Sequence, residues 1–252
     1  MRIDVLFTPA EFAEPALAGR TAIVVDVLRA STTIVEALGA GAREVLPVAD
    51  VAEALGLAGS GGATGDLAIV GGERGGLRCE GFDLGNSPRE YTPETVRGRR
   101  VVLCTTNGTR AIVAAAACGA AEVLVGAFTN LKAVVDAAAR AGRDVTVLCA
   151  GSEGRFSLED AVCAGGLVGG LAYRLGPAAD RSDAASAAET LFRAHRESLV
   201  RLFAASTHGR RLVDLGLGDD LPVAAVLNRH AVVPVLEADG AGGRAVLRAR
   251  RP

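Results

Sequence analysis

The side chains that could do chemistry gather in three short polar segments, residues 26–33, 105–110 and 149–155. Each segment follows an apolar, β-branched run that predicts a buried strand, and each precedes a stretch of helical composition. The polar segments are therefore expected at helix N-termini, where backbone N–H groups and the helix dipole favour anions. Their hydroxyl groups have a second explanation, which is that they only cap the helices.

Carboxylates near these segments predict a site for a hard metal ion. Asp26 ends a buried strand, Glu73 lies in a glycine-rich loop with Glu80 and Asp83, and Glu153 follows a third strand. Carboxylates of this kind, shared with water and substrate oxygens, suit Mg²⁺. Asp26 could instead cap a loop or interact with a helix dipole. Zinc is not expected, because the three histidines are far apart and none lies in an HExxH motif or beside a CxxC pair.

Four arginines lie in or beside the same segments, namely Arg29, Arg74, Arg110 and Arg155. A guanidinium group binds phosphate, sulfonate or carboxylate through two hydrogen bonds, so four of them together would select a polyanion. Each one alone could equally form a surface ion pair. Lys132 is the only lysine, which excludes a phosphate-loop lysine or a Schiff-base lysine at any other position.

Two stretches, Cys104 to Arg110 and Cys149 to Arg155, have the Cys-x5-Arg spacing of cysteine phosphatases. In such a site the loop amides cradle the phosphate and a helix N-terminus lowers the pKa of the thiol. The spacing also arises readily by chance in a chain this rich in arginine. We expect Cys149 to be buried and structural, because it ends an apolar run and has carboxylates nearby. Covalent catalysis, by Cys149 rather than Cys104, remains the alternative.

The elements that must position these side chains alternate between strands and helices, as in a helix-covered sheet. The predicted strands are residues 2–7, 21–27, 44–48, 67–70, 100–105, 122–126, 144–149 and 231–236. This order predicts an α/β fold, a three-layer sandwich with a largely parallel or mixed central sheet whose carboxyl edge carries the site. Residues 24–46 also align without a gap with residues 102–124, at an offset of 78 residues, which predicts two related halves.

Two long segments interrupt this alternation. Residues 71–92 combine glycine with charged and amide side chains, and such a loop inside a compact domain favours a functional role. Its polar side chains include Glu73, Arg74, Asn86 and Ser87. Residues 56–66 hold small residues and almost no charge, which predicts a flexible connector.

Local patterns predict one long helix and two helix caps. Residues 184–205 carry apolar side chains near one stripe, which is typical of a single helix packed on the core. Thr33 with Glu36, and Ser157 with Asp160, have the spacing of capping boxes.

Composition limits the class of protein. The 252 residues are 50% hydrophobic and 22% charged, so the chain can bury a substantial core, and we expect a single domain over residues 1–252. The net charge of −2 and the pI of about 6.0 argue against nucleic acid and against a membrane surface as partners. Five cysteines without a CxxC pair predict free thiols and a cytoplasmic location.

Several unusual segments occur in a fixed order between about residues 23 and 236, namely VVDVLRASTTIVEAL, GGERGGLRCEGFDLGNSP, TTNGTRAI, CAGSEGRFSLEDAVCAG, STHGRRL and the stretch from DD (219–220) to VVPVL (232–236). In these segments the sequence resembles the 2-phosphosulfolactate phosphatase family. The resemblance implies an α/β fold peculiar to that family and Mg²⁺-dependent release of phosphate from 2-phospho-3-sulfolactate, a step toward coenzyme M. This substrate carries about four negative charges, so arginines and Mg²⁺ would both help to bind it.

The resemblance also implies which residues form the pocket. The implied substrate-binding residues are Arg29, Ser31, Thr32, Arg74, Asn86, Ser87, Thr106, Asn107, Gly108, Thr109, Arg110 and Arg155. The metal ligands would be Asp26, Glu73 and Glu153, and the candidate catalytic groups are Asp26 and Cys149. Asp26 could be a metal ligand, a base that orients water, or a nucleophile that forms an aspartyl phosphate.

These observations support two hypotheses. The first is a Mg²⁺-dependent phosphatase that hydrolyses 2-phospho-3-sulfolactate or a related small anionic phosphoester to the 2-hydroxy acid. The second is a non-catalytic binding or sensor protein for a small sulfonated or phosphorylated anion, in which the arginines hold the ligand without a metal. Metal-dependent turnover distinguishes the two hypotheses. The Ala-rich, apolar composition also predicts a homodimer.

Overall fold

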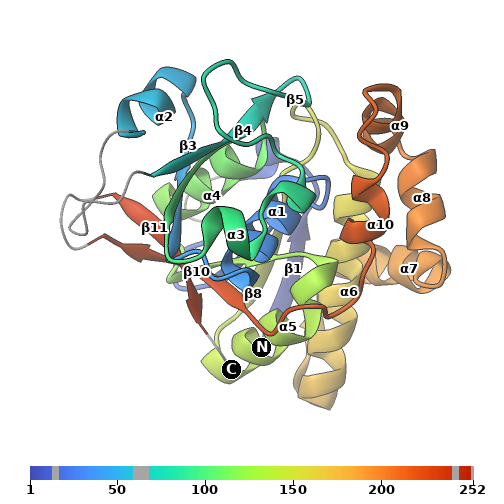
Figure 1. Ribbon diagram of the computed structural model, residues 1–252. Coiled ribbons are helices and arrows are strands. Elements are labelled where there is room, and N and C mark those ends of the chain that lie inside the picture. The colour runs from blue at the N-terminus through green and yellow to red at the C-terminus, as the bar shows by residue number, and fades with distance from the viewer. Residues whose placement is uncertain (13–16, 59–67, 240–243, 251–252) are drawn as a thin grey trace.

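The structure, a computed structural model, describes residues 1–12, 17–58, 68–239 and 244–250. Within these residues the protein is an α/β sandwich of three layers, in which helices cover both faces of one mixed, 11-stranded sheet (Figure 1). The strands are β1 (Arg2–Leu6), β2 (Thr21–Val25), β3 (Glu44–Val48), β4 (Ile69–Arg74), β5 (Leu77–Arg78), β6 (Arg100–Cys104), β7 (Glu122–Gly126), β8 (Val145–Cys149), β9 (Asp180–Arg181), β10 (Val233–Ala238) and β11 (Ala245–Arg250). The α-helices are α1 (Ala30–Gly39), α2 (Val51–Leu57), α3 (Pro93–Val96), α4 (Gly108–Ala117), α5 (Leu131–Ala141), α6 (Leu158–Leu175), α7 (Asp183–His195), α8 (Leu199–Ala205), α9 (Thr207–Asp214) and α10 (Asp220–Ala224).

The sheet consists of two parallel blocks joined by an antiparallel hairpin. Its strand order is β5-β4-β6-β3-β11-β10-β7-β2-β8-β1-β9. Strands β4, β6 and β3 are parallel to one another, as are β7, β2, β8, β1 and β9. The three pairs between the blocks, β3 with β11, β11 with β10 and β10 with β7, are all antiparallel. The two blocks therefore run in opposite directions.

Side chains on successive strand positions enter different cores, as the two-residue period of a strand requires. In β2, Ala22 and Val24 pack with α1 and α4 on one face of the sheet. Ile23 and Val25 pack on the other face with α5, α6 and α7. Helix α2 covers that second face behind the block of β4, β6 and β3. Both faces of both blocks are thus buried, which explains the nearly continuous apolar runs of these strands.

The two segments that align in sequence both form strand–helix–strand units. Residues 24–46 contain the end of β2, α1 and the start of β3, and residues 102–124 contain most of β6, α4 and the start of β7. Helices α1 and α4 keep the offset of 78 residues at both ends. Each unit starts in one block of the sheet and finishes in the other. That the two halves are related, and that the chain is a single domain, remain predictions.

The predicted strands differ from the observed ones mostly by one or two residues at their ends. The largest difference is β4, which reaches Arg74 and so removes the first part of the predicted loop 71–92. The short strand β5 and a 3-10 helix, η3 (Pro88–Glu90), occupy other parts of that loop. In the predicted connector 56–66, residues 56 and 57 end α2, and residues 59–66 lie outside the described residues.

One long helix over residues 184–205 is wrong. The chain forms α7 and then α8, and Ser198 begins the second helix. The turn at residues 196–198 redirects the chain, so that Leu199 and Phe203 of α8 reach the core. The apolar side chains of residues 184–205 do pack on the core, but they come from two helices.

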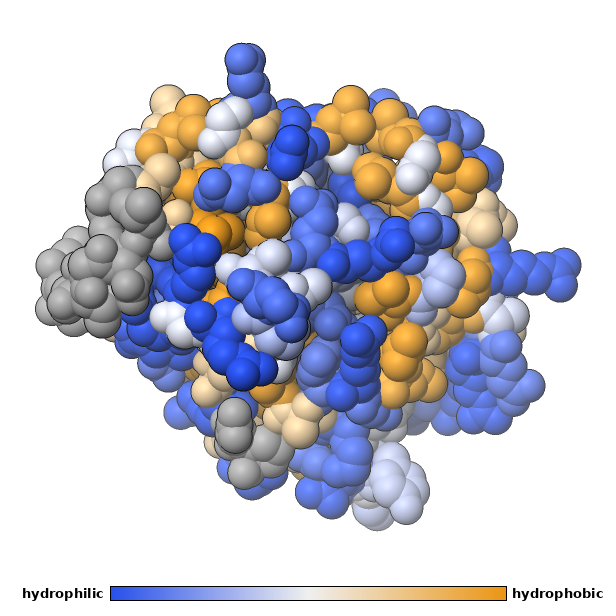
Figure 2. Space-filling model, in the orientation of Figure 1, coloured by the Kyte–Doolittle hydropathy of each residue, from blue (hydrophilic) through white to orange (hydrophobic). Residues whose placement is uncertain are grey.

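No helix in the described residues has the length and hydropathy that crossing a membrane requires. On the face shown in Figure 2, hydrophilic residues gather across the middle, between hydrophobic groups at the upper left and upper right. This face therefore presents no single continuous apolar surface.

Candidate active site

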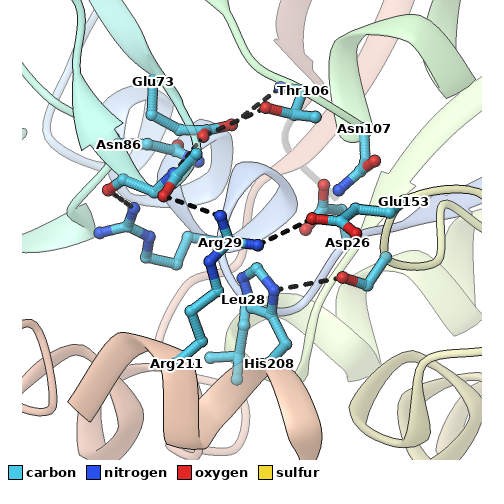
Figure 3. Close-up of a pocket in the computed structure, with 13 residues that line it drawn as sticks. Asp26, Leu28, Arg29, Glu73, Asn86, Thr106, Asn107, Glu153, His208 and Arg211 are labelled. Carbon is cyan, nitrogen blue, oxygen red and sulfur yellow. Dashed lines mark hydrogen bonds and ion pairs between the residues drawn. The ribbon is translucent and has the colours of Figure 1, made fainter. Parts of the chain in front are cut away.

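A small pocket lies where the turns after β2, β6 and β8 meet, beside the end of β4 and helix α9 (Figure 3). Its volume is about 40 Å³. The lining residues are Asp26, Leu28, Arg29, Glu73, Gly75, Gly76, Asn86, Thr106, Asn107, Ser152, Glu153, His208 and Arg211. All three polar segments that the sequence singled out thus contribute to one site.

The turn between β2 and α1 places Asp26 in the pocket. The Ser31 hydroxyl accepts a hydrogen bond from Asp26 N (2.8 Å), and Ser31 N donates to Asp26 O (2.8 Å). The Thr32 hydroxyl donates to Val27 O (2.8 Å). These two hydroxyl groups, which were predicted to bind substrate, hold the turn together. Thr33 lies inside α1 and donates to Asn86 O, so the predicted capping box of Thr33 and Glu36 is wrong.

Glu73 joins the end of β4 to the N-terminus of α4. One of its carboxylate oxygens accepts from Thr106 N (2.8 Å), and the other accepts from Gly76 N (2.8 Å) and from the Thr106 hydroxyl (3.2 Å). A methyl group at Gly72 would lie 1.9 Å from Cys104 O, so only glycine lets β4 pass this close to β6. The carboxylate of Glu73 is thereby fixed beside the pocket.

Arg29 is held in the pocket by two contacts, one of them fully buried. One terminal nitrogen of its guanidinium group lies 3.0 Å from Asp220 Oδ2, and the other donates to Gly76 O (2.6 Å). Asp220 Oδ1 also accepts from the Ser87 hydroxyl (2.6 Å). The Arg29 and Asp220 side chains are only 3% and 1% exposed. Ser87, predicted to bind substrate, instead supports the partner of Arg29.

The pocket concentrates negative charge. Burial, and then the charge of Glu73, raise the pKa of Asp26 from its ordinary value to about 7, while the amide of Gly108 acts in the opposite direction. A methyl group at Gly108 would lie 2.7 Å from Asp26 Oδ2, so glycine leaves room for the carboxylate at the start of α4. Asp26 and Glu73 are both buried. Their repulsion favours a cation or a proton between them.

Behind the pocket, Asp160 ties two of the turns together. Its carboxylate accepts from Val27 N (2.8 Å) and from Gly151 N (3.0 Å). Burial and the charge of Asp26 raise the pKa of Asp160. Ser157 does precede α6, but no side-chain hydrogen bond caps the helix there. The predicted capping box of Ser157 and Asp160 is wrong because Asp160 bonds to these two turns instead.

The family model for 2-phosphosulpholactate phosphatase matches residues 6–239. The chain belongs to this family. A protein of Symbiobacterium thermophilum named "Probable 2-phosphosulfolactate phosphatase" is 43% identical over 221 residues, which cover 87% of this chain and 92% of the relative. Proteins with the same name from Gloeobacter violaceus and Clostridium acetobutylicum are 42% and 36% identical, and each match covers 97% of the relative. In this chain the matches cover 95% and 93% of the residues.

For this member of the family, the pocket brings together seven of the predicted site residues. They are Asp26, Arg29, Glu73, Asn86, Thr106, Asn107 and Glu153. The Arg74 side chain points elsewhere and donates to Glu73 O, Ala49 O and the Cys104 thiol. Arg110 is exposed and lines a neighbouring cavity of about 290 Å³, and Arg155 is also exposed. The Thr109 hydroxyl bonds to Thr105 within the turn.

Cys149 does not line the pocket. Its side chain is completely buried, and burial together with the charge of Asp160 raises the pKa of its thiol. A buried, protonated thiol is a poor nucleophile. Cys104 is also buried, and burial raises its pKa although Arg74 contacts the sulfur. The structure thus favours a structural role for Cys149.

Sequence reasoning missed the contribution of α9. His208 and Arg211 both line the pocket, and His208 Nδ1 lies 3.4 Å from the Ser152 hydroxyl. It also missed Asp220, the partner of Arg29. The signals that could have found these residues were the STHGRRL segment and the DD pair at 219–220. Both formed part of the family resemblance without any role attached to their residues.

The pocket offers oxygen ligands that suit Mg²⁺. Among the described residues, no three His, Cys, Asp or Glu side chains gather closely enough to hold a metal by themselves. Two carboxylates, Asp26 and Glu73, line the same pocket as the Asn86 amide, whose buried oxygen has no hydrogen-bond partner in the described chain. Mg²⁺ usually takes one or two carboxylates and completes its shell with water and phosphate oxygens. Glu153 is more exposed and pairs with Arg211 (2.8 Å).

Proposed function

We propose that this protein hydrolyses 2-phosphosulfolactate, or a closely related small anionic phosphoester, to the 2-hydroxy acid and phosphate. The observation that carries the proposal is the juxtaposition of buried Arg29 with the carboxylates of Asp26 and Glu73 in a family member's pocket. The guanidinium group supplies charge and hydrogen bonds to a phosphate. The two carboxylates supply the repulsion that a divalent cation relieves.

We propose Mg²⁺ as the cofactor, held by Asp26, Glu73 and the Asn86 amide oxygen. A bound Mg²⁺ would neutralise phosphate charge and stabilise the transition state of an in-line displacement. Glu153 stays a predicted ligand, and its ion pair with Arg211 makes it the weakest of the set. The donors are hard oxygens, which fits Mg²⁺ better than a softer metal.

The protein's own side chains bind the phosphate and hold it in position for attack by water. Arg29 binds phosphate oxygens, and Asp220 and Gly76 O keep its guanidinium group in place. Water attacks phosphorus as the bond to the substrate's carbon-linked oxygen breaks, and that oxygen takes up a proton. Such a displacement needs positioning and charge neutralisation more than covalent help. It therefore leaves Cys149 no required role.

The test is phosphate release by purified protein from a panel of phosphorylated 2-hydroxy acids, with Mg²⁺ and with EDTA. We expect turnover that EDTA abolishes and added Mg²⁺ restores. The control is Asp26→Asn, which keeps the shape of the side chain and removes its charge. Binding of these compounds without any phosphate release would favour the sensor hypothesis. Metal-independent turnover that alkylation of Cys149 abolishes would favour thiol chemistry.

The cellular location and the oligomeric state of the protein are also proposals. We infer a cytoplasmic location, because all five cysteines are free thiols, as expected in a reducing compartment. A homodimer also remains a proposal, and light scattering during size-exclusion chromatography would test it.

A further inference from the structure

Helix α9 (Thr207–Asp214) supplies two side chains to the edge of the pocket. His208 and Arg211 are three residues apart, so they lie on one face of the helix and both point toward the pocket (Figure 3). A methyl group at Gly209 would lie 1.8 Å from Phe203 O, so glycine allows α9 to pack directly on the end of α8. The helix is thus fixed where these two side chains face the pocket.

Arg211 is held far more loosely than Arg29. It donates to Glu153 (2.8 Å) and lies 3.3 Å from Gly75 O. The side chains of Arg211 and Glu153 are 45% and 69% exposed, whereas Arg29 and its partner Asp220 are buried. Exposed ion pairs contribute little and are readily exchanged. A second anion can therefore displace Glu153 from Arg211.

The positions of the charges set the direction in which a substrate must lie. Asp26, Glu73 and Arg29 are buried, and Arg211 lies at the exposed edge. Among the described lining residues, Arg29 and Arg211 supply the guanidinium groups. A phosphate bound at the buried end would direct the rest of a small substrate toward Arg211. An oxyanion on the neighbouring carbon would then meet this guanidinium group.

The pocket must widen for a substrate to enter. Its volume of about 40 Å³ suits an ion with a few waters, whereas ligand pockets measure roughly 300 Å³ or more. The Arg211–Glu153 pair connects α9 to the turn after β8 across the exposed edge. Breaking this pair to open that edge costs little, because both side chains already contact water.

We propose that Arg211 binds the oxyanion that flanks the phosphate-bearing carbon of the substrate, and that it leaves Glu153 to do so. This inference rests on the proposed phosphatase function and adds the residue that selects a substrate with a second anionic group. The flanking oxyanion is a carboxylate or a sulfonate, and a guanidinium fork binds either. Three of the arginines that the sequence predicted for the site are placed less well than Arg211, since Arg110 lines the neighbouring cavity, and Arg74 and Arg155 line neither cavity.

The experiment compares kcat/KM of wild type and Arg211→Gln on three substrates in Mg²⁺. These are 2-phospho-3-sulfolactate, 2-phospholactate, which lacks the sulfonate, and O-phosphorylated 2-hydroxyethanesulfonate, which lacks the carboxylate. Loss of a charge-assisted hydrogen bond should lower kcat/KM for the full substrate roughly 10- to 100-fold, mainly through KM. The substrate that lacks the contacted anion should lose less than about threefold. Arg211→Lys should recover part of the loss, because it restores the charge without the fork.

The matched control is Arg210→Gln on the same helix. The Arg210 side chain is exposed and bonds to Ala205 O and Thr207, away from the pocket. The Arg210→Gln variant should therefore keep kcat/KM for all three substrates within about twofold of wild type. An equal loss on all three substrates in Arg211→Gln, or no loss on any, would overturn the proposal. If Arg110→Gln, and not Arg211→Gln, removes the preference for substrates with the flanking anion, that recognition belongs to Arg110. This result would also overturn the proposal.

A binding measurement separates this inference from the hydrolytic function. Calorimetry with the phosphate-free compounds 3-sulfolactate and lactate tests whether the flanking anion is recognised through Arg211. If wild type binds 3-sulfolactate and Arg211→Gln does not, recognition stands even if no phosphoester is hydrolysed. If wild type hydrolyses the substrates, and Arg211→Gln matches wild type both in its relative kcat/KM values and in its binding of 3-sulfolactate, recognition by Arg211 fails. The phosphatase function then stands.

Discussion

The buried pair of Arg29 and Asp220 provides a quantitative test of how the pocket is held. The two side chains are 3.0 Å apart and almost inaccessible to water. Asp220 also accepts from the Ser87 hydroxyl, so both of its oxygens are occupied. Asp220→Ala would leave the guanidinium group buried without its counter-ion. Breaking a buried pair from one side costs about 3–5 kcal/mol of unfolding free energy.

Asp220→Asn should cost less than Asp220→Ala. The amide oxygen can still accept from Arg29, and the amide nitrogen can donate to the Ser87 hydroxyl, which accepts as readily as it donates. Only the negative charge of the side chain is lost. A hydrogen bond to a charged group contributes about 1.5–3 kcal/mol, and this range is the upper limit that we expect for the unfolding free energy lost in Asp220→Asn. Activity should also fall less in Asp220→Asn than in Asp220→Ala, because Arg29 binds phosphate only while its orientation is kept.

The assay is urea unfolding at pH 7 by linear extrapolation, together with kcat/KM for phosphate release. The neighbouring Asp219 is the matched control, since it also pairs with an arginine, Arg89, at 3.0 Å. That pair is on the surface, with side chains 53% and 79% exposed, so Asp219→Ala should cost less than about 1 kcal/mol. If Asp220→Ala costs no more than Asp219→Ala, Asp220 does not hold Arg29 in the pocket.

The same geometry sets the expected effects of changes at Asp26, Cys149 and His208. Asp26→Asn should lower Mg²⁺-dependent kcat by roughly a hundredfold or more, and Mg²⁺ should raise the Tm of wild type but not of the variant. An unchanged response to Mg²⁺ would remove Asp26 from the metal site. Cys149→Ser should retain a measurable fraction of the wild-type rate of phosphate release, and a loss as large as that of Asp26→Asn would restore the thiol as nucleophile. For His208, burial lowers the pKa in the folded protein below the ordinary 6.5, so its contribution to stability is present above pH 6.5 and is lost as the pH falls from 6.5 through that lowered pKa. Urea unfolding in EDTA should therefore show a larger loss between pH 7 and pH 5 in wild type than in His208→Gln, and equal losses would contradict this.

The sequence located the turns of the site well, because the strands before them are apolar on both faces. Such runs are easily recognised, and the polar residues that follow them must lie at a strand end. Asp26, Thr106 and Glu153 were found in this way. His208, Arg211 and Asp220 come from α9 and α10, which follow other helices and not strands. Only packing of distant elements brings them to the pocket.

Hydroxyl groups show a different limit of sequence reasoning. Ser31, Thr32 and Thr109 follow strands, where a hydroxyl can either bind a ligand or stabilise its own turn. The structure uses all three within the turns. The choice depends on the direction of one side-chain torsion, which composition and spacing do not record. The carboxylates are less ambiguous, because a buried charge must find a partner.

The hairpin of β10 and β11 determines how the turns of the site come together, and local sequence patterns do not record it. The hairpin reverses one parallel block relative to the other, so an untwisted sheet would place the ends of β2 and β6 on opposite edges. Five steps separate these two strands in the sheet, and a twist of roughly 20–25° per step accumulates to roughly 100–125°. A rotation of this size would turn the two strand ends toward each other, and Asp26 and Thr106 do line one pocket. The local patterns could place each turn at the end of its own strand, but the meeting of the turns depends on pairings between strands far apart in the chain.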